Sequence, residues 1–289
     1  RCYALKPLRA AEKEAVYAPR INARYGTTAQ YCDVHTAYTP WGRTDYDART
    51  PGAGKFRTQF DAYARLLHNE SGAHKGPVFS EGNYHWFYAG IVDGNYATIV
   101  PYGRGWEFPP LADFDLLKMH TKLTDFGMGM PLMYYGTGGE WTKDRSRTSP
   151  FFDRFIAATI AFGHIGFLAD EWGFDGTLKS YYLLQALQQR YVSVPVKTIR
   201  YFDGKELADT SAAIADDAHK RGQIRTEYEN GLVTWCNLSF KDDWPVEVNG
   251  VAYTLPPGGF AAFKPDDILV YSATRNGQRH ELVWCRDYL

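Results

Sequence analysis

The first part of the chain alternates between helical and extended hydrophobic patterns. Residues 8–25 carry apolar side chains at helical spacing and end at Gly26, which predicts a helix. A second helix is expected from Phe56 onward, where apolar residues recur at i, i+4, i+7, i+8 and i+11. Short extended runs at 27–34 and 77–80 predict strands. The order helix, strand, loop, helix, strand is typical of a parallel sheet or barrel.

The pattern changes near residue 195, where short alternating runs follow one another. Asn-Gly pairs separate several of these runs, and such pairs are the strongest short-range signal for hairpins. We therefore expect residues 201–289 to form an antiparallel β-sandwich domain. The join at 192–202 is apolar and β-branched and has no linker character, so we expect it to be buried between the two parts. The turn pairs are Asn230-Gly231, Asn249-Gly250 and Asn276-Gly277.

Two consecutive predicted strands each end on a carboxylate, Asp33 and Glu81. Loops after the carboxyl ends of parallel strands build active sites. Retaining glycoside hydrolysis needs two carboxyl groups about 5–5.5 Å apart, and neighbouring strands lie about 4.8 Å apart. We therefore expect the pair to face one cleft, with a raised pKa for Glu81 as the acid. The alternative is that each carboxylate caps a loop or pairs with Arg43 or Arg49.

The aromatic fraction of 16% strengthens a carbohydrate interpretation, because sugar rings stack on flat side chains. Core packing is the alternative for each aromatic residue, a turn or cap for each aspartate, and a structural role for each histidine, His120 included. The candidate substrate-binding residues are His35, Trp41, Tyr84, His85, Trp86, Trp106, Asp113 and Asp115.

Charge and hydropathy exclude other classes. Lys plus Arg number 32 and Asp plus Glu 33, so the net charge of −1 argues against a nucleic-acid partner bound by bulk charge. The chain has no run of about 18 apolar residues, which argues against a membrane span. Its four cysteines are far apart in sequence, which favours buried free thiols over disulfides and over a zinc ribbon.

The segments Gln30-Tyr31-Cys32-Asp33-Val34-His35 and Pro77-Val78-Phe79-Ser80-Glu81-Gly82 resemble the fourth- and fifth-strand motifs of retaining α-glycosidase barrels. The resemblance is to the endo-α-N-acetylgalactosaminidase-like families, which have an α-amylase-like barrel. It implies that Asp33 is the nucleophile and Glu81 the acid/base of a hydrolase acting on α-linked glycosides. It also implies a secreted or periplasmic location and no cofactor, while allowing a structural calcium ion.

The same resemblance implies a fold class and a domain division. Residues 1–200 would form a (β/α) barrel portion of the α/β class, followed by the β-sandwich at 201–289. Only four or five strands precede the sandwich, and the first residue is Arg1, so strands one to three would lie upstream in an N-terminal portion of the same enzyme.

Two other functions remain open from the sequence. One is a non-catalytic carbohydrate-binding or scaffold subunit of the same fold. The other is a metal-dependent hydrolase, in which Asp33 with His35 and Glu81 with His85 supply carboxylate and imidazole ligands. No further ligand follows at helical spacing, so the residues themselves predict no metal site.

Overall fold

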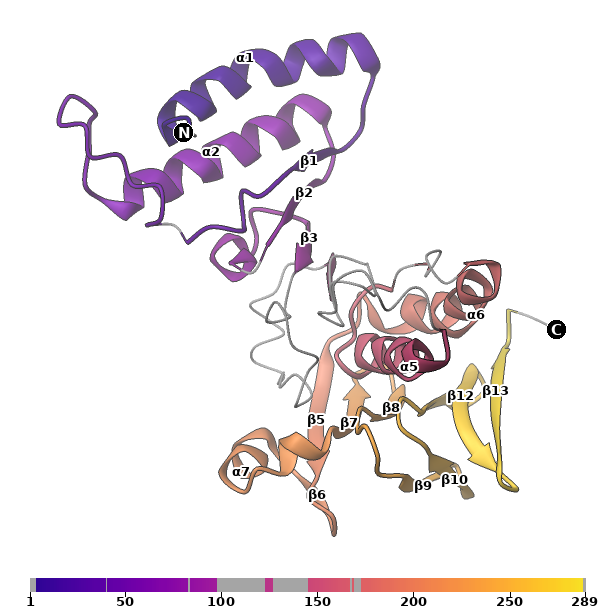
Figure 1. Ribbon diagram of the computed structural model, residues 1–289. Coiled ribbons are helices and arrows are strands. Elements are labelled where there is room, and N and C mark those ends of the chain that lie inside the picture. Colours follow the sequence, from indigo (N-terminus) through magenta and orange to yellow (C-terminus); the bar gives the residue numbers. More distant parts are fainter. Residues whose placement is uncertain are drawn as a thin grey trace. The chain divides into compact units, whose positions relative to one another are not determined.

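The computed structural model describes residues 4–39, 41–82, 84–97, 123–126, 145–166, 168 and 173–287. The chain divides into two compact units (Figure 1), and each is described by itself. The first comprises Arg1–Ile99 with Met119–Thr124, and the second comprises Val100–Lys118 with Asp125–Leu289. The boundary that we expected near residue 200 falls inside the second unit.

The first unit combines two long helices with a small sheet (Figure 1). The strands are in the order β1-β2-β3-β4. The pairs β1–β2 and β2–β3 are both parallel. Its elements are α1 (Pro7–Tyr25), β1 (Gln30–Cys32), α2 (Phe56–His74), β2 (Val78–Glu81), the 3-10 helix η1 (His85–Tyr88), β3 (Gly94–Ala97) and β4 (Leu123–Phe126).

The core of the first unit lies between the helices and one face of this sheet. Cys32 of β1 and Val78 of β2 are buried in a cluster with Ala11 of α1 and Leu67 of α2. Because side chains alternate along a strand, Tyr31 and the other odd-numbered residues of β1 and β2 lie on the opposite face. That face is the one on which the carboxylates stand.

The second unit is built on one antiparallel sheet of nine strands, which curls like half a barrel (Figure 1). Helices α5 and α6 pack on it, α5 against β8 and α6 against β12 and β13. Its elements are α5 (Arg145–Ala161), α6 (Gly173–Tyr191), β5 (Val196–Phe202), β6 (Leu207–Ala208), α7 (Thr210–Ala215), the 3-10 helix η4 (Ala218–Arg221), β7 (Gln223–Tyr228), β8 (Val233–Asn237), β9 (Trp244–Val248), β10 (Val251–Leu255), β11 (Phe260–Lys264), β12 (Ile268–Arg275) and β13 (Gln278–Cys285).

The hairpins that the Asn-Gly pairs predicted are confirmed. Strands β7–β8, β9–β10 and β12–β13 pair antiparallel around them. Asn249 and Gly250 have φ of 51° and 73°, and Asn276 and Gly277 have 51° and 77°. Two successive residues with positive φ are the type I′ geometry that matches the twist of the flanking strands.

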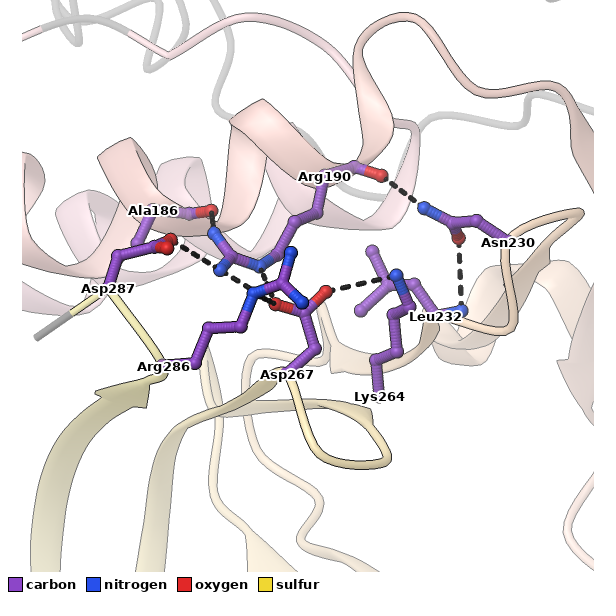
Figure 2. Close-up of polar contacts among 8 residues, drawn as sticks. All are labelled: Ala186, Arg190, Asn230, Leu232, Lys264, Asp267, Arg286 and Asp287. Atoms are coloured by element: carbon purple, nitrogen blue, oxygen red, sulfur yellow. Dashed lines mark hydrogen bonds and ion pairs between the residues drawn. The ribbon is translucent and has the colours of Figure 1, made fainter.

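A buried ion network fastens α6 to the sheet (Figure 2). The Arg190 guanidinium donates to Asp267 Oδ1 through Nε at 2.9 Å and Nη2 at 2.8 Å. It also donates to Asp287 at 2.7 Å, and Lys264 lies 3.0 Å from Asp267. Burial alone would raise the pKa of Asp267, but its hydrogen bonds with these cations lower it on balance.

The expected fold class, a (β/α) barrel followed by a β-sandwich, is wrong. Among the described strands, parallel pairing occurs in the small sheet of the first unit and not in the second unit. Helices α5 and α6 follow each other, and the described residues between them, 162–166 and 168, contain no strand. The join at 192–202 forms β5, which pairs with β7 inside the sheet. The C-terminal strands form one curled sheet where we expected two stacked ones.

Among the described residues, no helix is long and apolar enough to cross a membrane. Three cysteines, Cys32, Cys236 and Cys285, are buried free thiols, as their spacing predicted. Cys2 lies outside the described residues.

Candidate active site

Asp33 and Glu81 stand at the same edge of the small parallel sheet. Strand β1 ends at Cys32, which is in register with Ser80 of β2. Extending that register by one residue aligns Asp33 with Glu81, on the face away from the helical core. The alternation of buried and exposed side chains therefore directs both carboxyl groups to one side. The cleft that we expected around them stays a prediction.

The two carboxyl groups share a hydrogen bond. This bond, partial burial and the charge of Asp33 raise the pKa of Glu81 to about 7, while a hydrogen bond from the Val34 backbone N–H opposes the rise. When two carboxyl groups share one proton, the second carboxylate raises the pKa of the first, so the proton stays bound up to near-neutral pH. The raised pKa predicted for Glu81 is confirmed, and its main cause is the hydrogen bond with Asp33.

The turn after β1 fixes this geometry. Val34 has φ of 53°, a left-handed conformation that is costly for a β-branched residue. In that conformation its N–H donates to the Glu81 carboxyl group. The Tyr31 hydroxyl, two residues before Asp33 on the same strand face, donates to Asp33 Oδ1 at 3.3 Å. Besides the hydrogen bond between the two carboxyl groups, Asp33 therefore accepts one from Tyr31 and Glu81 accepts one from Val34.

A network of buried polar side chains forms hydrogen bonds with the backbone at the ends of these strands. Thr36 is fully buried, and its hydroxyl lies within hydrogen-bonding distance of the Glu81 carbonyl and of Asn95 Oδ1 on β3. Ser80 Oγ donates to the Cys32 carbonyl at 2.7 Å, and Asn95 Nδ2 donates to the Gly82 carbonyl at 2.9 Å. The network thus links the carboxyl ends of β1 and β2 to β3.

Gly82 allows the turn after β1 to approach the end of β2. Its φ is 121°, and a Cβ at this position would stand 2.1 Å from the Cα of Ala37. Only glycine fits this close approach, because any side chain would collide with backbone.

His35 lies beside the carboxyl pair and is held at both sides. Its Nδ1 is 2.8 Å from the Asp33 carbonyl, and its ring meets that of Tyr63 edge-on at 5.1 Å. Burial is the main reason that its pKa is lowered, and the charge of Arg43 adds to the effect. The imidazole is therefore neutral near pH 7. In this form it can hydrogen-bond with a substrate without adding a positive charge to the site.

Two predicted aromatic residues lie in the neighbouring loops. Trp41 is 54% exposed and meets Phe87 edge-on at 5.7 Å. Tyr84 is half-buried, and its backbone N–H donates to the Thr36 carbonyl at 2.8 Å. His85 and Trp86 belong to η1, and the structure describes their backbone but not their side chains. Trp106, Asp113, Asp115 and His120 lie outside the described residues.

The contacts of the neighbouring charged residues bear on the other interpretations of the two carboxylates. Arg49 pairs with Asp47 at 2.7 Å, and within the described ranges neither Asp33 nor Glu81 forms an ion pair with an arginine or lysine. The imidazole of His35 contacts the backbone of Asp33, not its carboxylate. The described part of the chain contains no group of three metal-ligating side chains.

Comparisons with known proteins add no relative. No family model matches the chain, and searches of curated proteins and of solved structures return no match.

Sequence reasoning missed the residues that hold the pair in place. Thr36, Asn95 and the Tyr31 hydroxyl carried no motif. The one available signal was Tyr31 itself, since residues two apart on a strand share a face. The contact between Thr36 and Asn95 joins positions 59 apart, which no local pattern marks.

Proposed function

We propose that the chain hydrolyses glycosides with Asp33 and Glu81 as its catalytic carboxyl pair. The observation that carries this proposal is the hydrogen-bonded pair at the ends of adjacent parallel strands, in which the pKa of Glu81 is raised to about 7. A general acid has to hold its proton near the working pH and still release it, and a pKa near neutrality meets both needs.

The roles follow from the protonation states. Glu81, protonated, gives its proton to the leaving oxygen as the bond between that oxygen and the anomeric carbon breaks. Asp33, as carboxylate, forms a bond to the same carbon and yields a glycosyl ester. In the second step Glu81 takes a proton from water, whose oxygen displaces Asp33 and restores both groups.

The closeness of the two groups supports retention of configuration. Inverting enzymes separate their carboxyl groups by about 6.5–9.5 Å so that a water fits between them and the sugar. Retaining enzymes hold the two groups closer together, about 5–5.5 Å apart. The contact between Asp33 and Glu81 is nearer to that arrangement than to the inverting one, which favours direct attack by Asp33.

Exposed aromatic side chains near the pair support a sugar as the substrate. Tyr31 precedes Asp33 on its strand, and Tyr38 and Trp41 belong to the loop that follows it; all three are exposed. Flat aromatic faces beside polar groups suit a ring with one apolar and one hydroxylated side.

The test is hydrolysis of a panel of aryl α- and β-glycosides by the native chain and by variants Asp33→Asn and Glu81→Gln. We expect both variants to lose at least a thousandfold in kcat. Asp61→Asn is the matched control, because this carboxylate is exposed on α2 and pairs only with Arg57 at 2.7 Å among the described residues.

A second measurement separates the two roles. In Asp33→Gly, added azide should replace the missing nucleophile and yield a glycosyl azide of inverted configuration. In Glu81→Gln, substrates with a good leaving group should retain more activity than those with a poor one. Hydrolysis that persists in both variants, or a panel that is bound but never cleaved, would contradict the proposal, and the second outcome would favour a binding protein.

A further inference from the structure

The Arg43 guanidinium lies over the Tyr38 ring and beside the Tyr63 hydroxyl. Its Cζ lies 4.0 Å from the centre of the Tyr38 ring, and its side chain hydrogen-bonds with the Tyr63 hydroxyl. Its backbone N–H donates to Gln59 Oε1 at 2.9 Å, which fixes the loop that carries it. The side chain is half-buried. Arg43 is therefore a partly desolvated cation held in a defined place.

This cation has no anion beside it in the part of the chain that the structure describes. Arg49 and Arg57 of the same unit do have one: Arg49 pairs with Asp47 and Arg57 with Asp61, each at 2.7 Å. A partly buried charge without a counter-ion loses hydration and gains no ion pair in return. An anionic ligand group would supply that pair, and the guanidinium fork suits planar or tetrahedral oxyanions in a bidentate manner.

The position of Arg43 connects it to the carboxyl pair through His35. The His35 ring stacks edge-on against Tyr63, the residue that Arg43 also contacts, and its Nδ1 is 2.8 Å from the Asp33 carbonyl. Two side chains, those of Tyr63 and His35, thus link Arg43 to the backbone of Asp33.

The same loop presents a stacking surface. Trp41 comes two residues before Arg43, is 54% exposed, and is braced edge-on by Phe87. An aromatic face and a cation on one short loop recognise a sugar ring and a charged substituent on it.

We infer that Arg43, with Trp41, forms a subsite for an anionic sugar unit, so that the glycan carries a carboxylate or sulfate group next to the bond that Asp33 and Glu81 cleave. This inference rests on the proposed function for the cleavage itself. The binding of the anionic unit to this subsite can be measured without hydrolysis.

The test measures the binding of two matched pairs of glycans to the full chain carrying Glu81→Gln, by isothermal titration calorimetry. Hyaluronan is compared with its carboxyl-reduced form, and chondroitin 4-sulfate with chondroitin from which the sulfate has been removed. We expect at least one anionic glycan to bind ten times more tightly than its partner. The hyaluronan pair reports carboxylate recognition, and the chondroitin pair reports sulfate recognition.

Variants assign the effect to Arg43. Adding Arg43→Gln should remove the tenfold preference, and Arg43→Lys should keep part of it because charge remains while the bidentate geometry is lost. Adding Arg57→Gln, which removes the same charge from the exposed face of α2, should leave the preference intact. Near-UV circular dichroism of each variant confirms that the rings around position 43 stay packed.

The inference is overturned if neither anionic glycan binds more tightly than its partner, or if Arg43→Gln and Arg57→Gln reduce the preference equally, as bulk charge would. Failure of the proposed function gives a different result: the preference persists and depends on Arg43, while the chain with an intact Glu81 cleaves none of the glycans. Cleavage of neutral glycans alone would refute the subsite and leave the proposed function standing.

Discussion

Replacing Asp33 by Asn should return the pKa of Glu81 toward that of an ordinary glutamate. The pKa of Glu81 rises from 4.5 to about 7, and the hydrogen bond with Asp33 is the largest cause. The rise corresponds to roughly 3 kcal/mol in favour of the protonated form, at about 1.4 kcal/mol for each tenfold change in proton affinity. Burial is the second cause and the charge of Asp33 the third, so the variant removes two of the three.

We expect the pKa of Glu81 in Asp33→Asn to fall by about 2, because the Asn amide can donate to the Glu81 carboxylate and so favours the ionised form. The assay is a pH titration of the side-chain carboxyl carbon by NMR, with glutamate labelled and the signal assigned through its loss in Glu81→Gln. No substrate is needed. In the native chain the same titration sets the basic limb of activity, which should decline above about pH 7 as Glu81 loses the proton it donates.

Asp61→Asn is the control for net charge, since it removes one negative charge from the same unit at an exposed site. It should leave the pKa of Glu81 near 7. A native-like Asp33→Asn protein in which Glu81 still titrates near 7 would show that the carboxyl groups do not share a proton, and the catalytic assignment would lose its main support.

Three further predictions concern stability, each measured by urea unfolding. Gly82→Ala should cost at least about 2 kcal/mol because its Cβ meets backbone, whereas Gly90→Ala, also at positive φ but in open space, should cost about 1; equal losses would contradict the close approach. Burial, with a hydrogen bond to Glu14, raises the pKa of Glu70 to about 8. The folded state therefore binds this proton more tightly, so the stabilisation is full below about pH 4.5 and is lost as the pH rises through 8; Glu70→Gln should abolish a fall of about 4 kcal/mol between pH 5 and pH 9. Asp267→Asn should cost about 3 kcal/mol because it leaves the buried Arg190 guanidinium with the exposed Asp287 carboxylate as its one anionic partner among the described residues, and a cost below about 1 kcal/mol would mean that water enters the network.

The carboxyl pair could be predicted because its placement depends on local signals and one topological rule. Asp33 and Glu81 each stand at the end of a short extended run, and a helix at 56–74 separates the runs. A strand, a helix and a second strand in that order pair in parallel, so both runs finish at the same edge. The spacing of the carboxylates then follows from the distance between neighbouring strands.

The groups that complete the site depend on the path of a loop, which no periodicity encodes. Val34 adopts a left-handed conformation that its β-branched side chain disfavours. Backbone propensity therefore predicts an extended conformation at Val34, whereas the left-handed one directs its N–H to Glu81. Thr36 meets Asn95 only because that turn folds back over β3.

The barrel and the sandwich were wrong for a related reason: alternation along a strand states which residues are buried, but not what buries them. Tyr271 and Ala273 of β12 lie in the cluster inside the curled sheet. Ile268 and Val270 are equally buried and lie on the other face of β12, where α6 packs. A strand covered on both faces has the same sequence pattern in a barrel, in a sandwich, or in one curled sheet with helices on its outer face. Which of these folds forms depends on where helices α5 and α6 pack on the sheet. That packing depends on long-range contacts such as the Arg190–Asp267 pair, whose partners are 77 residues apart in the sequence.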